Sequence, residues 1–228
     1  MSKFIRLNIT AEGQTEEKFV KTCLSSYLGD KNISTDVRSI LTRKDKFKHY
    51  RGGLINYKKA KRDIQTWMKH DNTDNVFFTT MFDYYALPND FPYFEESKEI
   101  QNPYDRVAFL EKKFEEDIND RRFIAYIQLH EFEALLFSNP EILIEDYFEY
   151  EKEIENLVQI SKEFVNPELI NDKPATAPSK RLKNIIPPFD KVNIGAIAIC
   201  RIGIENLKQS CKHFNDWITK LESITNNK

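Results

Sequence analysis

The sequence predicts an α/β fold: a mostly parallel four-stranded sheet flanked by helices and followed by a C-terminal helical extension. Segments with the apolar spacing of strands and of helices alternate along the chain in the order β-α-β-α-β-α-β. Residues 76–82 are almost continuously apolar, which is typical of a strand that is covered on both faces of a parallel sheet.

The first elements lie before residue 70. Residues 4–9 alternate in polarity, as a half-buried strand does, and lead into a turn at residues 12–13. A helix opens at residues 15–17, where two acidic side chains suit the positive end of the helix dipole. A second strand is predicted at 35–41, and a second helix follows the glycine pair at 52–53.

The third strand ends at Asp83 and is followed by a loop at 86–103 that contains three prolines. Loops of this length in a compact domain are often functional. We expect a third helix at 105–120 and the fourth strand at 123–129, which runs directly into a helical segment at 130–137.

The remaining sequence is less regular. Residues 141–164 are acidic with helical spacing, a proline-containing loop follows, and the chain is mostly helical from residue 180 to about 221. We therefore expect a core of α/β type at 1–138 and a helical extension at 139–228 that packs on the core.

Composition predicts a soluble, cytoplasmic protein. The 228 residues are 40% hydrophobic and 31% charged, and no apolar run reaches the roughly 18 residues of a membrane span. The N-terminus lacks the features of a signal peptide. Cys23, Cys200 and Cys211 have no metal-type spacing, so we expect reduced thiols, with Cys23 and Cys200 in the core.

The net charge of −2 hides two segregated segments. Residues 38–62 contain ten lysines and arginines against one acid, whereas residues 141–155 contain seven acids against one lysine. A basic stretch in a nearly neutral protein is compatible with a polyanionic partner such as nucleic acid. Two solvated faces are the plainer interpretation, and charge alone favours it.

Acidic residues follow three of the predicted strands. Glu12 follows the first strand, Asp83 the third, and Glu131 and Glu133 the fourth. Open parallel sheets bind ligands at the carboxyl ends of their strands. Carboxylates gathered there repel one another unless a cation neutralises them, and Mg²⁺ prefers such oxygens. Alternatively, each acid simply caps a turn or a helix N-terminus.

Glu12-Gly13-Gln14-Thr15-Glu16 is the sharpest motif, because the glycine permits a tight turn and leaves room for a phosphate at the following helix. A strand ending in Glu-Gly-x-Thr-Glu, with a later strand ending in Asp83, resembles the Toprim domain of topoisomerases, primases and overcoming-lysogenisation-defect (OLD) nucleases. This resemblance implies a Toprim-like core that holds Mg²⁺ or Mn²⁺ through Glu12, Glu16 and Asp83.

A narrower resemblance covers nearly the whole chain. The sequence is similar to a bacterial family of unknown function through four further motifs, namely Phe82-Asp83-Tyr84-Tyr85, Leu87-Pro88 with Asp90-Phe91-Pro92, residues 128–137, and Ala177-Pro178-Ser179-Lys180-Arg181-Leu182. Its members resemble the OLD-type and RloB-like proteins that are encoded beside an ATPase in bacterial defence loci. The resemblance implies an ATPase partner.

The chain departs from the Toprim pattern at one position. Toprim domains usually carry Asp-x-Asp after the third strand, whereas here Asp83 is followed two residues later by Tyr85. Either Asp90 or the pair Glu131 and Glu133 replaces the missing acid, or the site binds metal weakly. This departure bears on activity more than on fold.

His130 lies three residues before Glu133, so the two would share a face of a helix. The sequence lacks the second histidine of a His-Glu-x-x-His zinc motif. We consider His130 a candidate general acid or base, or a phosphate contact. The plainer alternative is a hydrogen-bonded histidine at the end of a strand.

Two basic motifs are candidate phosphate contacts. Arg51-Gly52-Gly53 before a helix offers backbone N–H groups and a guanidinium, although a plain loop is as good an explanation. Ser179 is a suitable N-cap that places Lys180 and Arg181 in a first turn, where the dipole disfavours cations. That placement suggests an anion held nearby, and a solvated surface helix is the alternative.

These observations predict a Mg²⁺- or Mn²⁺-dependent phosphodiesterase, a nuclease acting on DNA or RNA. Glu12, Asp83 and Glu131 or Glu133 would hold one or two ions, and the basic motifs would contact the nucleic-acid backbone. The alternative, favoured by the missing second acid, is a non-catalytic Toprim-like subunit that docks on an ATPase through the acidic 141–155 segment. No membrane partner is expected, and self-association stays open.

Overall fold

The computed structural model describes residues 4–44, 49–51, 54, 56–170 and 176–225. Its central sheet is parallel throughout, as predicted, with the spatial order β2-β1-β5-β6 and with β7 also paired to β5. The strands are β1 (Ile5–Ala11), β2 (Ile33–Ser39), β5 (Val76–Asp83), β6 (Phe123–Ile124) and β7 (Ile127–Gln128).

The sheet has five strands instead of the predicted four, because the predicted strand at 123–129 is interrupted. At the interruption the buried hydroxyl of Thr80 accepts a hydrogen bond from the Tyr126 N–H (3.0 Å) and donates one to the Tyr126 carbonyl (2.9 Å). A side chain of β5 therefore satisfies the Tyr126 backbone where a regular ladder would use backbone groups.

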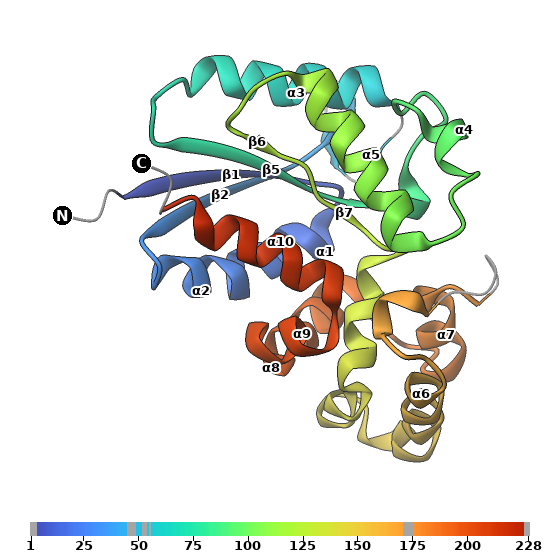
Figure 1. Ribbon diagram of the computed structural model, residues 1–228. Coiled ribbons are helices and arrows are strands. Elements are labelled where there is room, and N and C mark those ends of the chain that lie inside the picture. The colour runs from blue at the N-terminus through green and yellow to red at the C-terminus, as the bar shows by residue number, and fades with distance from the viewer. Residues whose placement is uncertain (1–3, 45–48, 52–53, 55, 171–175, 226–228) are drawn as a thin grey trace.

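Helices cover both faces of the sheet, so the molecule has three layers (Figure 1). In that view α3 and α5 lie above the sheet, whereas α1, α2 and α10 lie below it. Their bounds are α1 (Gln14–Phe19), α2 (Ser25–Gly29), α3 (Tyr57–His70), α5 (Pro103–Ile118) and α10 (Lys212–Ser223), with the short α4 (Phe94–Ser97) preceding α5 and the π-helical turn Val20–Leu24 joining α1 to α2.

Local sequence signals account for the two long helices above the sheet. The Asn56 side chain accepts the Lys59 N–H (2.8 Å) at the start of α3, and the Asn102 side chain accepts the Tyr104 N–H (2.9 Å) at the start of α5. The apolar face of α3, formed by Tyr57, Ala60, Ile64, Trp67 and Met68, is buried.

An antiparallel hairpin that the sequence analysis did not anticipate follows β2. It consists of β3 (Leu41–Lys44) and β4 (His49–Arg51). The predicted phosphate motif Arg51-Gly52-Gly53 falls at its end. The Arg51 side chain and both glycines lie outside the described residues, so this motif stays a prediction.

The C-terminal part consists of short helices. After 3₁₀ segments at Phe132–Ser138 (η3), Pro140–Glu145 and Phe148–Tyr150 come α6 (Glu151–Glu163), the 3₁₀ turn Pro167–Leu169, α7 (Pro178–Ile185), the π-helical turn Lys191–Gly195 (η8), α8 (Ala196–Ile202) and α9 (Ile204–Ser210). The predicted helix at 130–137 is therefore 3₁₀ in type and begins at Phe132. Among the described residues, every helix is too short or too polar to span a membrane.

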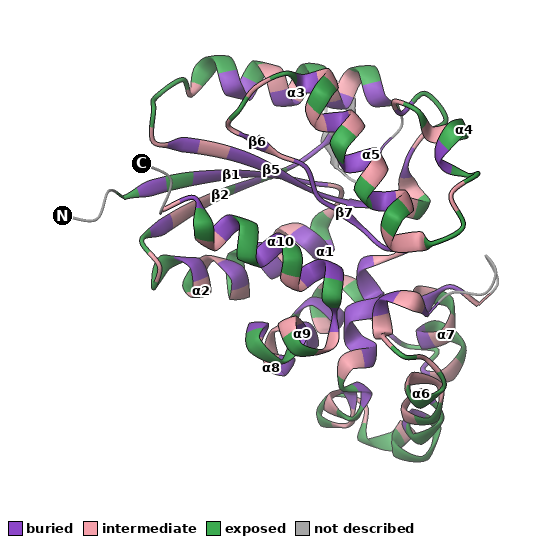
Figure 2. Cartoon of the chain, viewed as in Figure 1, coloured by how far each residue is buried: buried purple, intermediate pink, exposed green. Residues whose placement is uncertain are grey.

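The core forms two clusters, one on each face of the sheet. The cluster above contains Phe78 and Phe82 of β5, and the cluster below joins Leu7 of β1 to Phe214 and Trp217 of α10. Figure 2 shows most of β1 and β5 buried and the outer faces of the helices exposed. The C-terminal part thus shares one core with β1, and the domain boundary near residue 138 stays a prediction.

The cysteines differ from expectation in burial. Cys23 and Cys200, which we expected in the core, are half-buried at its margin, whereas Cys211 is fully buried. The indole N–H of Trp217 donates to the Thr79 hydroxyl (3.0 Å), which fixes α10 against the centre of the sheet.

Candidate active site at the acidic edge of the sheet

The carboxyl ends of β1 and β5 lie at the point where the chain changes direction across the sheet. From β1 the chain passes through α1 and α2 to β2 at one edge, and from β5 it passes through α5 to β6 on the opposite side. Open α/β sheets bind ligands at such a switch point. Glu12 directly follows β1, and Asp83 is the last residue of β5.

The structure brings Glu12 and Asp83 together. The Glu12 N–H donates to the Met81 carbonyl (2.9 Å), which extends the pairing of β1 and β5 by one residue. The Asp83 N–H in turn donates to Oε2 of Glu12 (3.1 Å). Parallel register therefore holds the Glu12 carboxylate across from the end of β5.

Two further buried carboxylates join them. Glu16 in the first turn of α1 accepts the Gly13 N–H (2.9 Å) at Oε2, which closes the Glu-Gly turn after β1. Glu133 lies in the first turn of η3 and is only 2% exposed. We call Glu12, Glu16, Asp83, Glu131 and Glu133 together the acidic edge.

The carboxylates of the acidic edge perturb one another electrostatically. Burial raises the pKa of Glu12 to about 7, although the Asp83 N–H and Lys191 oppose the rise. Burial likewise raises the pKa of Glu16 to about 7, with added repulsion from Glu12 and Glu133. The acids therefore hold protons that isolated glutamates release below pH 5.

Asp83 is affected in the same direction. Burial raises its pKa well above the usual range, and the charges of Glu12, Glu16 and Glu133 raise it further, against a hydrogen bond from the Phe132 N–H. Like charges that share a buried site cannot all ionise without a cation between them. The acidic edge is therefore a buried cluster of carboxyl groups that repel one another when ionised.

Lys191 of η8 is the cation that the structure places there. Its Nζ lies 3.1 Å from Oε1 of the buried Glu133 carboxylate, with which it forms an ion pair. Burial lowers the pKa of Lys191, but the charges of Glu133, Glu16 and Asp83 outweigh that effect and raise it. Its side chain remains 49% exposed, so it also faces solvent.

Sequence reasoning missed Lys191. It stands in no motif, and 57 residues separate it from Glu133 along the chain. The only local signal is Asp190, whose side chain accepts the Asn193 N–H (2.8 Å) and starts the turn. That signal predicts a turn and says nothing about the acids that the turn approaches.

Glu131 links the acidic edge to α7. Its Oε2 accepts the Ser179 N–H (2.9 Å) in the first turn of that helix. Because α7 begins after Ala177 with Pro178 in its first position, the prediction that Ser179 is the N-cap is wrong. The first turn of α7 thus has a carboxylate of the chain itself, that of Glu131, as an acceptor.

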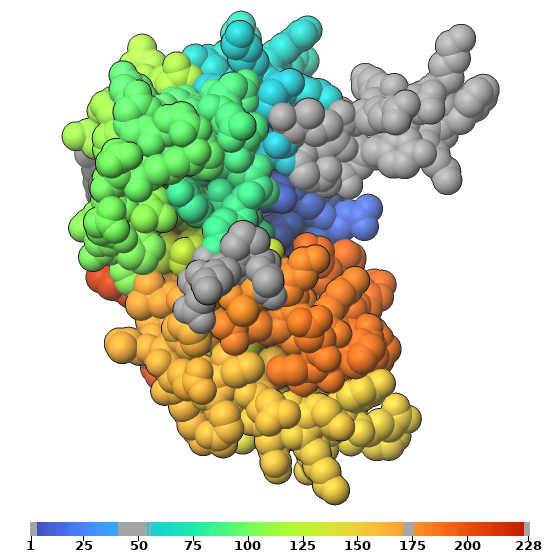
Figure 3. Space-filling view, turned by 90° about the vertical axis from the view of Figure 1, so that its right-hand side faces the viewer, coloured from blue at the N-terminus to red at the C-terminus, as the bar shows by residue number. Residues whose placement is uncertain are grey.

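The two basic residues of α7 have different surroundings. Lys180 is exposed, whereas Arg181 is half-buried, donates from Nε to the Thr176 carbonyl (2.6 Å) and lies 5.9 Å from the centre of the Phe164 ring. Figure 3 looks onto this side, where the orange C-terminal residues adjoin the blue and green residues of the sheet and its helices.

His130 and Asp90 lie in other surroundings. His130 adopts a left-handed backbone (φ 63°) before η3 begins, so the prediction that it shares a helix face with Glu133 is wrong. Its ring lies 5.3 Å from that of Tyr85, and burial with the charge of Arg106 lowers its pKa to about 4. Asp90 instead accepts the Tyr57 N–H (2.9 Å) at the start of α3.

The carboxylate oxygens of the acidic edge are the type of ligand atom that a hard divalent cation prefers. Four carboxylates converge, and three of them, Glu12, Glu16 and Asp83, have pKa values raised by burial and mutual repulsion. Within the described residues, however, no three acidic, histidine or cysteine side chains are arranged as a ready-made metal site. The oxygens that suit Mg²⁺ or Mn²⁺ are present, and a ligand geometry is not preformed.

A family model described as a domain of unknown function (DUF4276) matches residues 11–222. The chain belongs to the DUF4276 family. The predicted membership of a family of unknown function is thereby confirmed, and the DUF4276 region contains the whole acidic edge together with Lys191. No curated protein and no solved structure gives a significant match to the chain.

Proposed function

We propose that this DUF4276 protein is a Mg²⁺- or Mn²⁺-dependent phosphodiesterase that cleaves nucleic acid. The observation that carries the proposal is the convergence of Glu12, Glu16, Asp83 and Glu133 beside the switch point of the sheet, with three raised pKa values. A bound divalent cation would relieve this repulsion. The acids, which hold protons when no cation is bound, would then ionise.

The residues of the acidic edge and Lys191 have different roles in the proposed reaction. A divalent cation supplies Lewis-acid activation of a water molecule and of the phosphate. Glu12 and Asp83 would hold it from the ends of adjacent strands. Glu16, which interacts with Glu12 and Glu133 in the same buried cluster, would accept the proton of the attacking water. Lys191, half-exposed beside Glu133, stabilises negative charge that develops on the phosphate oxygens.

The basic start of α7 would hold the nucleic-acid backbone. Lys180 is exposed, and α7 is tied to the acidic edge through the hydrogen bond from Ser179 to Glu131. Phosphate contacts of this kind position a strand without reading its sequence. DNA and RNA are both substrates of the proposed class.

The sequence motifs support a Toprim-like core and a place in bacterial anti-phage defence beside an ATPase, in the cytoplasm. The acidic segment is the proposed docking surface for the ATPase. Of its side chains, Glu145 and Asp146 pair with Arg201, whereas Glu149, Glu151, Glu153 and Glu155 are exposed along or just before α6.

A second candidate is a non-catalytic regulatory subunit of an ATPase complex. Two observations favour it: Tyr85 stands where a second acid would lie, and no three-ligand group is preformed among the described residues. In this alternative Lys191 alone balances the acidic edge, and the exposed face of α6 carries the function.

Metal-dependent stabilisation tests the proposal without a known substrate. We expect millimolar MgCl₂ or MnCl₂ to raise the Tm at pH 8, because a ligand that binds only the folded state stabilises it. Glu12→Gln should abolish that rise and also abolish cleavage of single-stranded DNA or RNA in Mn²⁺. Glu153→Gln removes an exposed acid of α6 and serves as the matched control.

The outcomes separate the two candidates. A Tm rise that Glu12→Gln removes and Glu153→Gln keeps supports the metal site. If neither metal changes the wild-type Tm, and no cleavage occurs with or without the proposed ATPase partner, the phosphodiesterase proposal is overturned and the non-catalytic subunit is favoured.

A further inference from the structure

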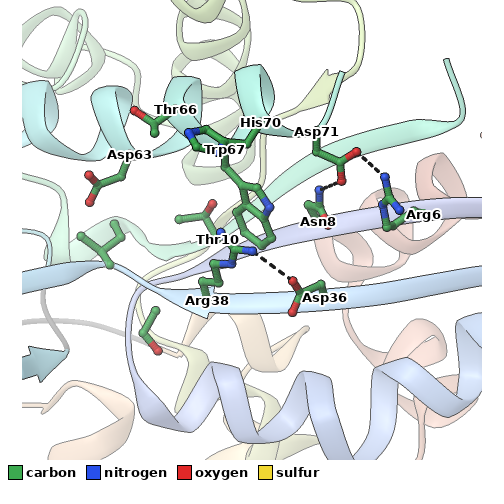
Figure 4. A pocket seen from close by; sticks show the side chains of 12 residues that line it. Arg6, Asn8, Thr10, Asp36, Arg38, Asp63, Thr66, Trp67, His70 and Asp71 are labelled. Carbon is green, nitrogen blue, oxygen red and sulfur yellow. Dashed lines mark hydrogen bonds and ion pairs between the residues drawn. The ribbon is translucent and has the colours of Figure 1, made fainter. Parts of the chain in front are cut away.

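Polar side chains line one strip of the sheet, on the face that α3 covers. On the α3 side, β1 and β2 present polar side chains, namely Arg6, Asn8, Thr10, Asp36 and Arg38, while the alternating residues Leu7 and Ile9 face the core below. A cavity of about 620 Å³ lies between this strip and α3 (Figure 4). Sites for small organic ligands fall in this size range. We call it the sheet-face cavity.

Its most distinctive feature is a stacked pair. The guanidinium carbon of Arg38 lies 3.9 Å from the centre of the Trp67 ring. Trp67, which belongs to α3, is buried, whereas the Arg38 side chain is 59% exposed. The guanidinium therefore lies over the indole, and more than half of the Arg38 side chain remains accessible to a ligand. Guanidinium planes stack well on nucleobases.

The charges of the cavity are paired within it. Arg6 forms an ion pair with Asp71, which also accepts the Asn8 amide (2.9 Å), and Arg38 lies 3.4 Å from Asp36. A multiply charged anion would have to compete with these carboxylates. A neutral aromatic ring with hydrogen-bonding edges suits the cavity better, because it can stack on Arg38 and donate to the half-exposed Asp36 carboxylate.

The cavity leads toward the acidic edge. Thr10 of β1 lines the cavity and lies two residues before Glu12. Ser39 also lines it and donates to the Gly13 carbonyl (3.2 Å). A ring in the cavity would therefore direct its attached sugar and phosphate toward the Glu12-Gly13 turn. The carboxylates of the acidic edge lie beyond that turn.

We propose that the sheet-face cavity binds a nucleobase, which stacks on the Arg38–Trp67 pair. The substrate would then be a nucleotide or an unpaired strand of nucleic acid. The link to cleavage rests on the proposed function of the acidic edge, whereas base binding itself does not. Asp36 favours bases that carry an exocyclic amino group, which uracil and thymine lack.

Calorimetric titration in EDTA tests base binding separately from metal chemistry. The ligands are AMP, CMP and UMP, ribose 5-phosphate, and short single-stranded oligo(dA) and oligo(dT). We expect AMP and CMP or oligo(dA) to bind wild-type protein, and Arg38→Lys, which keeps the charge but loses the plane, to weaken binding about tenfold. Arg121→Lys, an exposed arginine outside the cavity, is the matched control.

A second variant tests the role of Asp36, which is half-exposed and whose replacement leaves the core intact. Asp36→Asn should reduce the preference of the protein for AMP over UMP while its Tm stays unchanged. Binding of mononucleotides identifies a free nucleotide as the ligand, and binding of oligonucleotides alone identifies a strand. Either result supports the proposal.

Three results overturn it: no binding of any base-containing ligand, binding that Arg38→Lys leaves unchanged, or ribose 5-phosphate binding as tightly as AMP. Glu12→Gln should keep base binding in EDTA. Base binding by a protein that shows no metal-dependent Tm rise would reject the phosphodiesterase and keep the cavity. A metal-dependent Tm rise without base binding would reject base binding in the cavity and keep the phosphodiesterase.

Discussion

Glu12 and Glu16 belong to one five-residue motif, yet each owes its raised pKa to burial and to residues from elsewhere in the chain. Burial is the largest cause for both, and Glu133 raises both pKa values further. The sequence identifies these glutamates as candidates because they surround a glycine turn after a strand. Their protonation is decided by the elements that close over them, which are η3 and η8.

The raised pKa values of Glu12 and Glu16 predict the pH dependence of stability without metal. In the unfolded chain these groups titrate near 4.5, and in the folded protein near 7. Their contribution to folding is therefore fully present below pH 4.5 and is lost as the pH rises through 7. We expect the free energy of unfolding in EDTA to fall by about 1–3 kcal/mol per group across this range.

Urea unfolding at pH 5, 6, 7 and 8 measures that fall. Glu16→Gln keeps an acceptor for the Gly13 N–H and removes the charge, so it should flatten the curve, whereas Glu153→Gln should leave it unchanged. Addition of Mg²⁺ at pH 8 should restore part of the lost stability. A wild-type curve that is flat from pH 5 to 8 contradicts the prediction.

The elements follow local sequence signals except where a side chain or a tertiary contact intervenes. β5 ends at Asp83 as predicted, and α3 and α5 begin at capping asparagines. The fourth predicted strand is divided because Thr80 of β5 bonds both backbone groups of Tyr126. Apolar alternation continues through Tyr126, so the sequence pattern could not reveal this interruption.

Thr80 is predicted to be necessary for this connection. Thr80→Val keeps the shape of the side chain but leaves the buried N–H and C=O of Tyr126 without partners. We expect a loss of about 1–3 kcal/mol in the free energy of unfolding, measured by urea denaturation. Thr80→Ser retains the hydroxyl and should recover most of that loss. Equal stabilities of the valine and serine variants would contradict the role of the hydroxyl.

In the whole molecule, C-terminal residues contribute to the lower layer of the fold. α10 packs against the sheet through Phe214, Trp217 and Leu221, and Tyr126 stacks on the Trp217 ring at 4.2 Å. The buried carboxylate of Glu168 accepts the N–H groups of His213 and Phe214 at the start of α10. The acidic edge also depends on this part, which supplies Lys191.

Removal of α10 is therefore predicted to unfold more than α10. A chain that ends at Ser210 exposes the apolar faces of β1 and α1, and we expect it to lose cooperative thermal unfolding as measured by circular dichroism. A chain that ends at Thr225 keeps all of α10 and should melt like the full protein. Cooperative melting of the shorter chain would show that residues 1–210 fold without α10.

The sequence by itself determined the parallel α/β architecture, the strand ends that carry Glu12 and Asp83, and the family. These features depend on apolar periodicity and on turn residues, which act within a few positions along the chain. The tertiary structure decided the split of the last strand, the left-handed backbone of His130, the partners of Glu131 and Lys191, and the sheet-face cavity. These features arise because packing brings together groups that are remote in sequence, and because burial sets the strength of their charges.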